Sequence, residues 1–228
     1  EFRVNSQTLY HQENASVGMD TDGDFVVAWQ STDPDGSDYR IYAQRYNAAG
    51  VAQGSEFRVN SYTLNSQQGP SVGMDADGDF VILWSSSGQD GSGTGIYAQR
   101  YNSSGVVQGS EFRINSYTTN NQSTPSIGID ADGDFVVSWT SNGQDGSGFG
   151  IYAQRYSSSG VPQGTEFQVN LFTTDSQQSP CLGMDADGDF VVAWSSYQDG
   201  SSSGIYVQRF RVNNAAPVLN NTGAPVLN

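Results

Sequence analysis

A repeat of 55 residues runs through the chain, and it restricts the possible folds more than any other feature of the sequence. The segment EFRVN begins at Glu1 and Glu56, and its variants EFRIN and EFQVN begin at Glu111 and Glu166, so the spacings 56 − 1, 111 − 56 and 166 − 111 are equal. Only the fourth copy loses one residue, in the loop before Ile205. Self-similarity at such a period is typical of solenoids and propellers, in which neighbouring units complete each other's core.

Each repeat predicts four short strands. In the second copy these are 71–75, 80–84, 96–101 and a last strand that runs from Val106 into EFRIN. The run before each tryptophan, such as FVILW, is continuously apolar, which indicates a strand buried on both faces. Because radially repeated four-stranded sheets form the blades of propellers, we predict an all-β, four-bladed β-propeller with four antiparallel strands per blade.

The predicted domain spans residues 1–212. The N-terminal strand, residues 1–5, supplies the strand that the fourth blade lacks, and we expect it to close the ring. A larger ring made by two chains is the alternative, and the oligomeric state stays open. Residues 213–228 depart from the repeat, contain APVLN twice, and are rich in Pro and Asn, which indicates a C-terminal linker or tail.

A glycine recurs within each predicted innermost strand, at Gly18, Gly73, Gly128 and Gly183. Glycine weakens a strand unless another backbone comes close or a bulge interrupts the pairing. Close approach of neighbouring innermost strands is the favoured interpretation, and a bulge at each glycine is the alternative.

The charge of the chain restricts its partners. It contains 24 Asp and Glu against 9 Lys and Arg, all of the latter arginine, which gives a net charge of −15. Such a surface disfavours nucleic acid, whose affinity comes from cationic phosphate contacts, and no apolar run is long enough for membrane insertion. The single cysteine, Cys181, excludes an internal disulfide, and its alignment with serines predicts a small buried thiol.

Half of the acidic residues recur in one short hairpin of each repeat, which carries the pattern Asp-x-Asp-Gly-Asp. Three carboxylates so close together suit a hard cation, so calcium is the one cofactor that the sequence suggests. The alternative is a turn with a left-handed glycine, whose aspartates bond their own backbone. The candidate metal ligands are Asp20, Asp22, Asp24, Asp75, Asp77, Asp79, Asp130, Asp132, Asp134, Asp185, Asp187 and Asp189, joined by Asp33 and Asp38 in a loop of the first copy.

The loop between the second and third strands is the candidate ligand site. It carries Gln-Asp-Gly in three copies and a different, more acidic sequence in the first. Amide, carboxylate and hydroxyl groups beside aromatic rings suit sugar hydroxyls, although such a composition is also ordinary for flexible loops. The candidate ligand-binding residues are Gln89, Asp90, Gln144, Asp145, Gln198, Asp199, Asp35 and Tyr39.

The repeat unit, as in residues 74–81 continued through 95–101, resembles units of very large secreted bacterial proteins of the adhesin-like and calcium-binding repeat type. The segment Asn-Ala-Ala-Pro-Val-Leu in the tail resembles the entry to cadherin-like or immunoglobulin-like modules. A weaker similarity extends to Asp-box and integrin-type propeller repeats. The resemblance implies an extracellular or cell-surface location in a bacterium, and it transfers no functional residue.

Enzymatic function is disfavoured by the sequence. His11 is the only histidine, lysine is absent, and near-identical copies place identical groups in identical surroundings, whereas a catalytic centre needs unlike environments for its acid and base. We therefore predict a non-catalytic, multivalent, lectin-like module that binds a carbohydrate or cell-surface ligand. A calcium-rigidified structural or adhesion repeat without its own ligand is one alternative, and a glycoside hydrolase that uses paired carboxylates is another.

Overall fold

The computed structural model describes residues 1–32, 38–200, 202–212, 218–219 and 225–227. The chain divides into two compact units, Glu1–Pro125 and Ser126–Asn228, which are described separately below. The assignment of residues 1–212 to one domain remains a prediction. Among the described residues no helix has the length and hydropathy of a membrane span.

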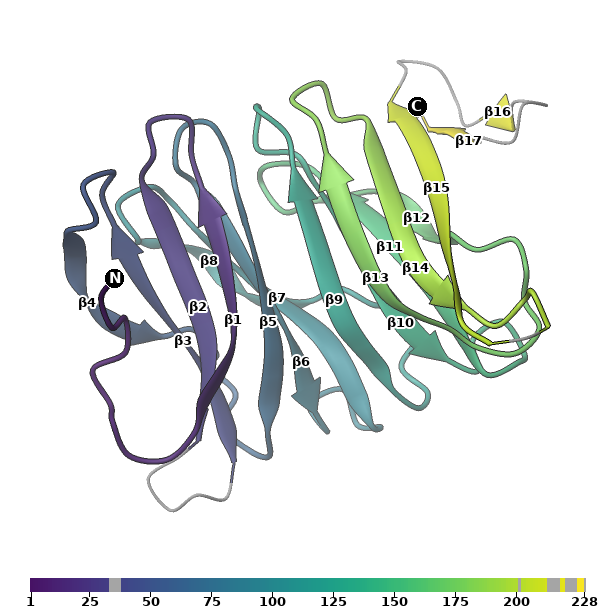
Figure 1. Ribbon diagram of the computed structural model, residues 1–228, viewed down its shortest axis with the longest axis horizontal. Helices are drawn as coiled ribbons and strands as arrows, with labels where there is room; N and C mark the ends of the chain where they lie inside the picture. The colour runs from purple at the N-terminus through teal and green to yellow at the C-terminus, as the bar shows by residue number, and fades with distance from the viewer. Residues whose placement is uncertain (33–37, 201, 213–217, 220–224, 228) are drawn as a thin grey trace. The chain divides into compact units, whose positions relative to one another are not determined.

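The first unit contains two antiparallel four-stranded sheets, each in simple sequential order (Figure 1). The first sheet consists of β1 (Gln12–Met19), β2 (Phe25–Thr32), β3 (Tyr39–Tyr46) and β4 (Ala52–Arg58). The second sheet consists of β5 (Gln67–Met74), β6 (Phe80–Ser87), β7 (Thr94–Tyr101) and β8 (Val107–Arg113). Sequential pairing follows from the short turns, because connections of five or six residues can join only neighbouring antiparallel strands.

The second unit repeats this arrangement. Its first sheet consists of β9 (Gln122–Ile129, whose first four residues belong to the first unit), β10 (Phe135–Asn142), β11 (Phe149–Tyr156) and β12 (Pro162–Gln168). Its other sheet consists of β13 (Gln177–Met184), β14 (Phe190–Ser196) and β15 (Gly204–Val212), to which the short strands β17 (Pro225–Leu227) and β16 (Val218–Leu219) are added. The predicted set of four antiparallel strands per repeat is thus confirmed for the first three repeats.

The core of each unit is formed by the two central strands of its sheets. In the first unit Val26, Ile41, Ile82 and Trp84 are buried in one cluster, which accounts for the unbroken apolar runs in the sequence. A phenylalanine at the start of each second strand stacks on an aromatic ring of the third strand, as in the Phe80–Tyr101 pair with ring centroids 4.9 Å apart. Each sheet is therefore fixed in register by the same aromatic pair.

The innermost strands of neighbouring sheets meet at the recurrent glycines, as expected. A Cβ at Gly18 would lie 2.8 Å from Val72, and one at Gly128 would lie 2.3 Å from Leu182. The irregular pairing of these strands lies nearer their start, between Glu13 and Ser16 in β1, so the alternative of a bulge at the glycine is wrong there. Gly18 and Gly128 therefore serve close approach between sheets, whereas no described atom lies within 4 Å of a Cβ at Gly183.

Three expectations need correction. Residues 1–5 form no strand, and closure of a ring by them is not detected among the described residues. Instead Phe2 packs on Tyr46 of the first sheet, with ring centroids 5.2 Å apart. Cys181 is free and exposed rather than buried. In the tail, β16 and β17 form two short strands, and the rest of the predicted linker lies outside the described residues.

Candidate functional site

The acidic hairpins are turns whose aspartates bind their own backbone. Asp20 Oδ1 accepts the N–H groups of Asp22 and Asp24, both at 2.9 Å, and Gly23 has a φ of 89°. Asp24 Oδ1 accepts the N–H of Ala48 from the next turn at 2.8 Å. The same bonds recur in the other three repeats. The turn interpretation is confirmed, because the first and third aspartates of each hairpin satisfy backbone donors.

The middle aspartates of the hairpins, Asp22, Asp77, Asp132 and Asp187, are exposed. In the first unit Asp22 and Asp77 line a cleft of about 150 Å³ between two hairpins, together with Arg45. Within the described residues no group of three or more acidic, His or Cys side chains is arranged to hold a metal ion. Calcium binding at these carboxylates therefore remains a prediction.

Two hairpin carboxyls have altered acidity. Burial raises the pKa of Asp75 and of Asp130 above the ordinary value, and the neighbouring carboxylates of each hairpin act in the same direction. The backbone N–H groups that each carboxylate accepts lower the pKa and partly offset this effect. These two groups are thus easier to protonate in the folded chain than in the unfolded chain.

The Gln-Asp-Gly loops direct their predicted ligand groups inward. Gln89 accepts a hydrogen bond from Ser86 Oγ at 2.7 Å and donates one to Glu111 at 2.6 Å, and Gln144 donates to Glu166. Asp90 and Asp145 each accept the N–H of the serine two residues later, at 3.1 Å. In the second and third repeats these side chains therefore form hydrogen bonds within their own repeats, and ligand binding by them remains a prediction.

The loop of the first repeat is only partly described. Asp33 and Asp35 lie outside the described residues. Asp38 accepts a hydrogen bond from Ser66 Oγ at 3.0 Å and lies 3.9 Å from the Arg40 guanidinium. A hydrogen bond with Glu13 raises the pKa of Tyr39, so this tyrosine is engaged within its own repeat.

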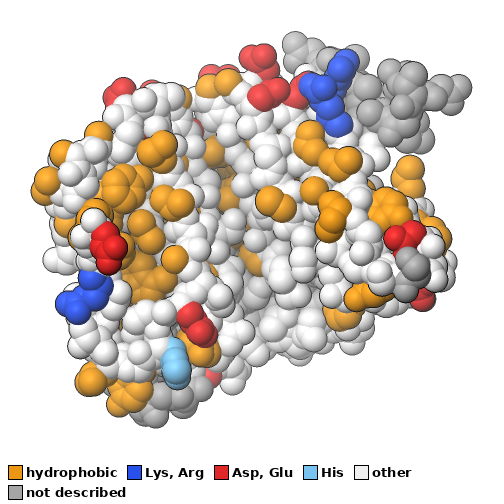
Figure 2. Space-filling view, in the orientation of Figure 1, with side chains coloured by type: hydrophobic (Ala, Val, Ile, Leu, Met, Phe, Trp, Pro, Cys, Tyr) orange, Lys and Arg blue, Asp and Glu red, His pale blue; other side chains and the backbone are white. Residues whose placement is uncertain are grey.

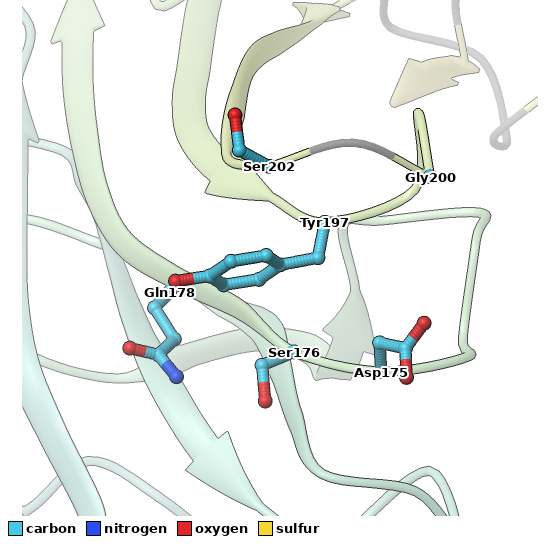
Figure 3. A pocket seen from close by; sticks show the side chains of 6 residues that line it. All are labelled: Asp175, Ser176, Gln178, Tyr197, Gly200 and Ser202. Atoms are coloured by element: carbon cyan, nitrogen blue, oxygen red, sulfur yellow. The ribbon is translucent and has the colours of Figure 1, made fainter.

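The fourth repeat has a different loop, beside an open groove. Asp175, Ser176, Gln178, Tyr197, Gly200 and Ser202 line a cavity of about 590 Å³, which we call the tyrosine groove. Figure 3 shows the Tyr197 ring between the loop that carries Ser202 and the segment that carries Asp175, Ser176 and Gln178. The volume lies within the range of about 300–1,000 Å³ that is usual for small-molecule sites. Tyr197 and Gly200 flank the predicted ligand residues Gln198 and Asp199, so the groove adjoins the predicted loop.

The groove lies where the fourth repeat departs from the other three. Tyr197 replaces a pair of small polar residues, Ser87-Gly88 or Asn142-Gly143, because the one-residue deletion falls here. The tyrosine is 50% exposed, so a ring face is available to a ligand. The signal in the sequence is the one-residue deletion together with the added aromatic residue, Tyr197.

Asp175 is the second departure. The equivalent positions hold Asn65 and Asn120, and all three residues have a φ between 55° and 62°. Asparagine and aspartate tolerate this left-handed backbone, so the fold accepts either residue and only the fourth repeat places a carboxylate there. A Cβ at Gly148 would lie 2.7 Å from the Asp175 carbonyl oxygen, so the third-repeat loop holds this segment in position.

Comparison with known proteins identifies the fold. No protein-family model and no curated protein sequence matches the chain. Among solved structures, an α-L-arabinanase from Penicillium chrysogenum in complex with arabinobiose is similar with a TM-score of 0.57 and 15% identity, over 90% of this chain and 68% of that chain. An endo-arabinase from Bacteroides thetaiotaomicron has a TM-score of 0.54 and 14% identity, over 94% of this chain and 81% of that chain.

A third similar structure is a sucrose-6-phosphate hydrolase from Lactobacillus gasseri, with a TM-score of 0.54 and 9% identity, over 91% of this chain and 47% of that chain. At these identities the similarity shows the fold. The chain therefore has an all-β fold of the β-propeller type with four blades of antiparallel strands, as the sequence predicted.

The same comparison overturns our functional prediction. These similar propellers are glycoside hydrolases, whereas we predicted a non-catalytic, lectin-like module or a calcium-rigidified adhesion repeat. We disfavoured an enzyme because we assumed four equivalent copies. That assumption is wrong at the tyrosine groove, where the fourth repeat places a carboxylate and an exposed aromatic ring that the second and third repeats lack.

Proposed function

We propose that this chain is a glycoside hydrolase that cleaves a neutral polysaccharide or oligosaccharide bound in the tyrosine groove. The observation that carries the proposal is the groove itself, in which Asp175 and the exposed Tyr197 ring come together at a place where the fourth repeat departs from the second and third. The propeller fold, which the chain shares with arabinanases and a sucrose-6-phosphate hydrolase, supports the same reaction class.

The lining of the groove suits a sugar. A sugar ring presents C–H groups on its faces and hydroxyls at its edge, so it stacks on the Tyr197 ring while Ser176, Gln178 and Ser202 exchange hydrogen bonds with its hydroxyls. Among the described lining residues Asp175 is the one charged side chain, and it is acidic. On the face drawn in Figure 2, acidic side chains are scattered among hydrophobic and uncoloured ones. We therefore assign an uncharged substrate.

Hydrolysis of a glycosidic bond needs two carboxyl groups, one as an acid and one as a base or nucleophile. Asp175 provides the first. We assign the second to Asp199, which lies in the loop between the lining residues Tyr197 and Gly200 but is not itself a lining residue, because its Oδ2 is directed toward Gly204. In the reaction the bond between the anomeric carbon and the bridging oxygen breaks, one carboxyl gives its proton to the departing oxygen, and water supplies the new hydroxyl and returns a proton.

The test is release of reducing ends from a panel of neutral polysaccharides, including arabinan and xylan. We expect Asp175→Asn and Asp199→Asn each to lower kcat at least about 100-fold, because acid–base groups contribute about 10²–10⁴-fold. Tyr197→Ala should raise KM about tenfold, since stacking on an aromatic ring is worth about 1 kcal/mol or slightly more.

The matched control is Asp145→Asn, which changes the aspartate equivalent to Asp199 in the third repeat. It should leave kcat unchanged, because Asp145 bonds Ser147 and Gln168 within its own repeat. Equal losses in the Asp145 and Asp199 variants would point to a shared structural effect and would contradict the assignment.

We further propose that the protein acts outside a bacterial cell. The resemblance of its repeats to those of large secreted proteins supports this location, and a polysaccharide too large to enter a cell must be cleaved there. Detection of the protein in the cytoplasm of the producing cell, and not outside it, would contradict the proposal.

A further inference from the structure

The first strand of the fourth sheet carries one extra residue next to the tyrosine groove. In β13 Gln178 pairs with Ser195, and the next paired residue is Cys181, opposite Ala193. Two residues of β13 thus lie opposite the one residue that separates these partners. Such a bulge bends the strand and re-aims a side chain. The bulge residue Ser179 has a φ of 56°, a left-handed value that is uncommon outside glycine.

The bulge determines on which face of the sheet Gln178 lies. Directly opposite residues of paired strands share a face, as does every second residue along a strand. The pairing therefore places Gln178 on the face of Cys181. Without the extra residue it would lie on the face of Leu182, which packs on Gly128 of the third sheet. Burial agrees, because Gln177 is fully buried, whereas Gln178 is partly exposed and lines the groove.

A side chain of the third sheet holds the bulge in place. The N–H of Ser179 donates to Thr140 Oγ1 of β10 at 3.1 Å, and both residues belong to the second unit. An equivalent bond occurs in the first unit, where the N–H of Gly69 donates to Gln30 Oε1 at 2.8 Å. Thr140 is 3% exposed, so the packed interior fixes its hydroxyl and, through this bond, the bulge.

The first repeat shows where a side chain at this position reaches. Glu13 is the counterpart of Gln178, and it accepts hydrogen bonds from Gln30 Nε2 at 3.1 Å and from Tyr39 at the start of β3. The position thus faces the loop between the second and third strands. The amide of Gln178 forms no hydrogen bond with another described residue, so it is available to a ligand in the groove.

We propose that Gln178 is the specificity-determining residue of the tyrosine groove and that Thr140 is its positioning residue. An amide offers an acceptor and a donor side by side, so it binds two neighbouring hydroxyls of one sugar unit at once. In Figure 3 the amide lies toward the hydroxyl end of the Tyr197 ring and Asp175 toward the other end, so Gln178 holds the sugar and does not act on the bond that breaks. The substrate class is a neutral polymer whose sugar units keep two adjacent hydroxyls free. This role rests on the hydrolase activity proposed for the same groove.

Partial O-methylation of the substrate tests this role, because a methyl ether at one hydroxyl removes one partner of the amide. For arabinan or xylan, whichever is cleaved, Gln178→Leu should raise KM about tenfold and leave kcat unchanged, since the two hydrogen bonds form before the transition state. The unaltered chain should prefer the native polymer over its O-methylated form, and Gln178→Leu should lose most of that preference. An unchanged KM, or the same preference in both chains, would overturn the assignment.

The positioning role of Thr140 has a separate test. Thr140→Val removes the acceptor of the Ser179 N–H and keeps the shape of the side chain, so KM should rise about threefold at unchanged kcat. Thr140→Ser keeps the hydroxyl and should keep the KM. The matched control is Gln30→Met, which removes the acceptor of the Gly69 N–H and should leave KM unchanged. Equal KM values for Thr140→Val and the unaltered chain, or an equal rise with Gln30→Met, would exclude positioning through the bulge.

Binding separates the role of Gln178 from the proposed hydrolysis. Calorimetry with arabinan- or xylan-derived oligosaccharides uses the Asp199→Asn chain, in which every lining residue of the groove is retained. Affinity that requires free hydroxyls and Gln178, without release of reducing ends by the unaltered chain, would support the Gln178 assignment and contradict the hydrolase. Hydrolysis that is independent of Gln178 would overturn the assignment alone, and the absence of both binding and hydrolysis would overturn both.

Discussion

At the residue scale, the first aspartate of each hairpin is the structural one and the middle aspartate is dispensable. Asp20→Ala removes the acceptor of two backbone N–H groups and should lower the free energy of unfolding by roughly 1–3 kcal/mol. Asp22→Ala should change it by less than about 0.5 kcal/mol, since exposed side chains without such bonds contribute little. Urea denaturation of the two variants measures this difference. Equal losses would instead support a cation held jointly by both carboxylates.

The raised pKa values of Asp75 and Asp130 predict a pH dependence. The folded chain binds these protons more tightly than the unfolded chain, so the two carboxyls lower stability as pH rises from 3.8 through the folded pKa, and the loss persists at neutral pH. Asp75→Asn keeps the Oδ1 acceptor and removes the charge. Its melting temperature at neutral pH should equal or exceed that of the unchanged chain, with a flatter dependence on pH in the acidic range. A lower melting temperature together with an unchanged pH dependence would contradict the raised pKa of Asp75.

Residue roles were the part that sequence alone predicted least well. The pattern Asp-x-Asp-Gly-Asp is compatible with a turn and with a cation site, and the structure adds that Asp20 Oδ1 and Asp24 Oδ1 accept backbone N–H groups, while cation binding remains a prediction. Likewise, Gln89 and Gln144 have the composition of a ligand loop but turn inward to Glu111 and Glu166. Side-chain direction depends on tertiary partners that lie about 22 positions away, as their pairing with these glutamates shows, so local composition could not predict it.

At the scale of the element, the recurrent glycines of the innermost strands have different surroundings. A methyl group at Gly128 would overlap Leu182 and Met184, so Gly128→Ala should cost roughly 1–3 kcal/mol of stability. No atom lies within 4 Å of a Cβ at Gly183, so Gly183→Ala should be neutral or slightly stabilising. Chemical denaturation of this matched pair checks the packing between sheets. A destabilised Gly183→Ala variant would show that another surface covers β13.

The elements themselves were largely predictable. Apolar runs such as Phe80–Trp84 and the turn glycines define strands and connections, and β6 and β7 pair in the register that these turns impose. The first strand of each blade begins earlier than the sequence indicated, at Gln67 in the second copy, because buried Gln67 continues the ladder although it is polar. Residues 1–5 match a strand in sequence, but a strand forms only when its backbone groups pair with a neighbour. Among the described residues no strand pairs with this segment, so it is not a strand.

At the scale of the whole molecule, the net charge of −15 predicts substrate selectivity. A polyuronate would be repelled by the protein as a whole and by Asp175 within the groove. We expect at least about tenfold lower kcat/KM for a uronate-rich polysaccharide than for its neutral analogue at low ionic strength, with the gap narrowing as salt screens the charges. Equal rates on the two substrates at low salt would exclude this electrostatic selection.

The repeat correctly predicted the propeller fold, but the non-catalytic, multivalent function that we inferred from it was wrong. Four copies suggest four equal sites, yet the functional candidate is the place where the fourth copy differs, through Asp175 and Tyr197. An enzyme built from repeats needs to change only one of them, because the others provide the scaffold that positions the altered groups. The departure from the repeat therefore carries more functional information than the repeat itself.

The most direct test of this account restores the symmetry of the fourth repeat. Asp175→Asn combined with Tyr197→Ser gives both positions a residue type of the second repeat, keeps the one-residue deletion, and leaves the buried core untouched. Hydrolysis of a neutral polysaccharide, followed by release of reducing ends, should fall at least about 100-fold while the melting temperature stays the same. Hydrolysis at an unchanged rate by the double variant would contradict the proposal that the tyrosine groove is the active site. So would the absence of hydrolysis of any neutral polysaccharide by the unaltered chain.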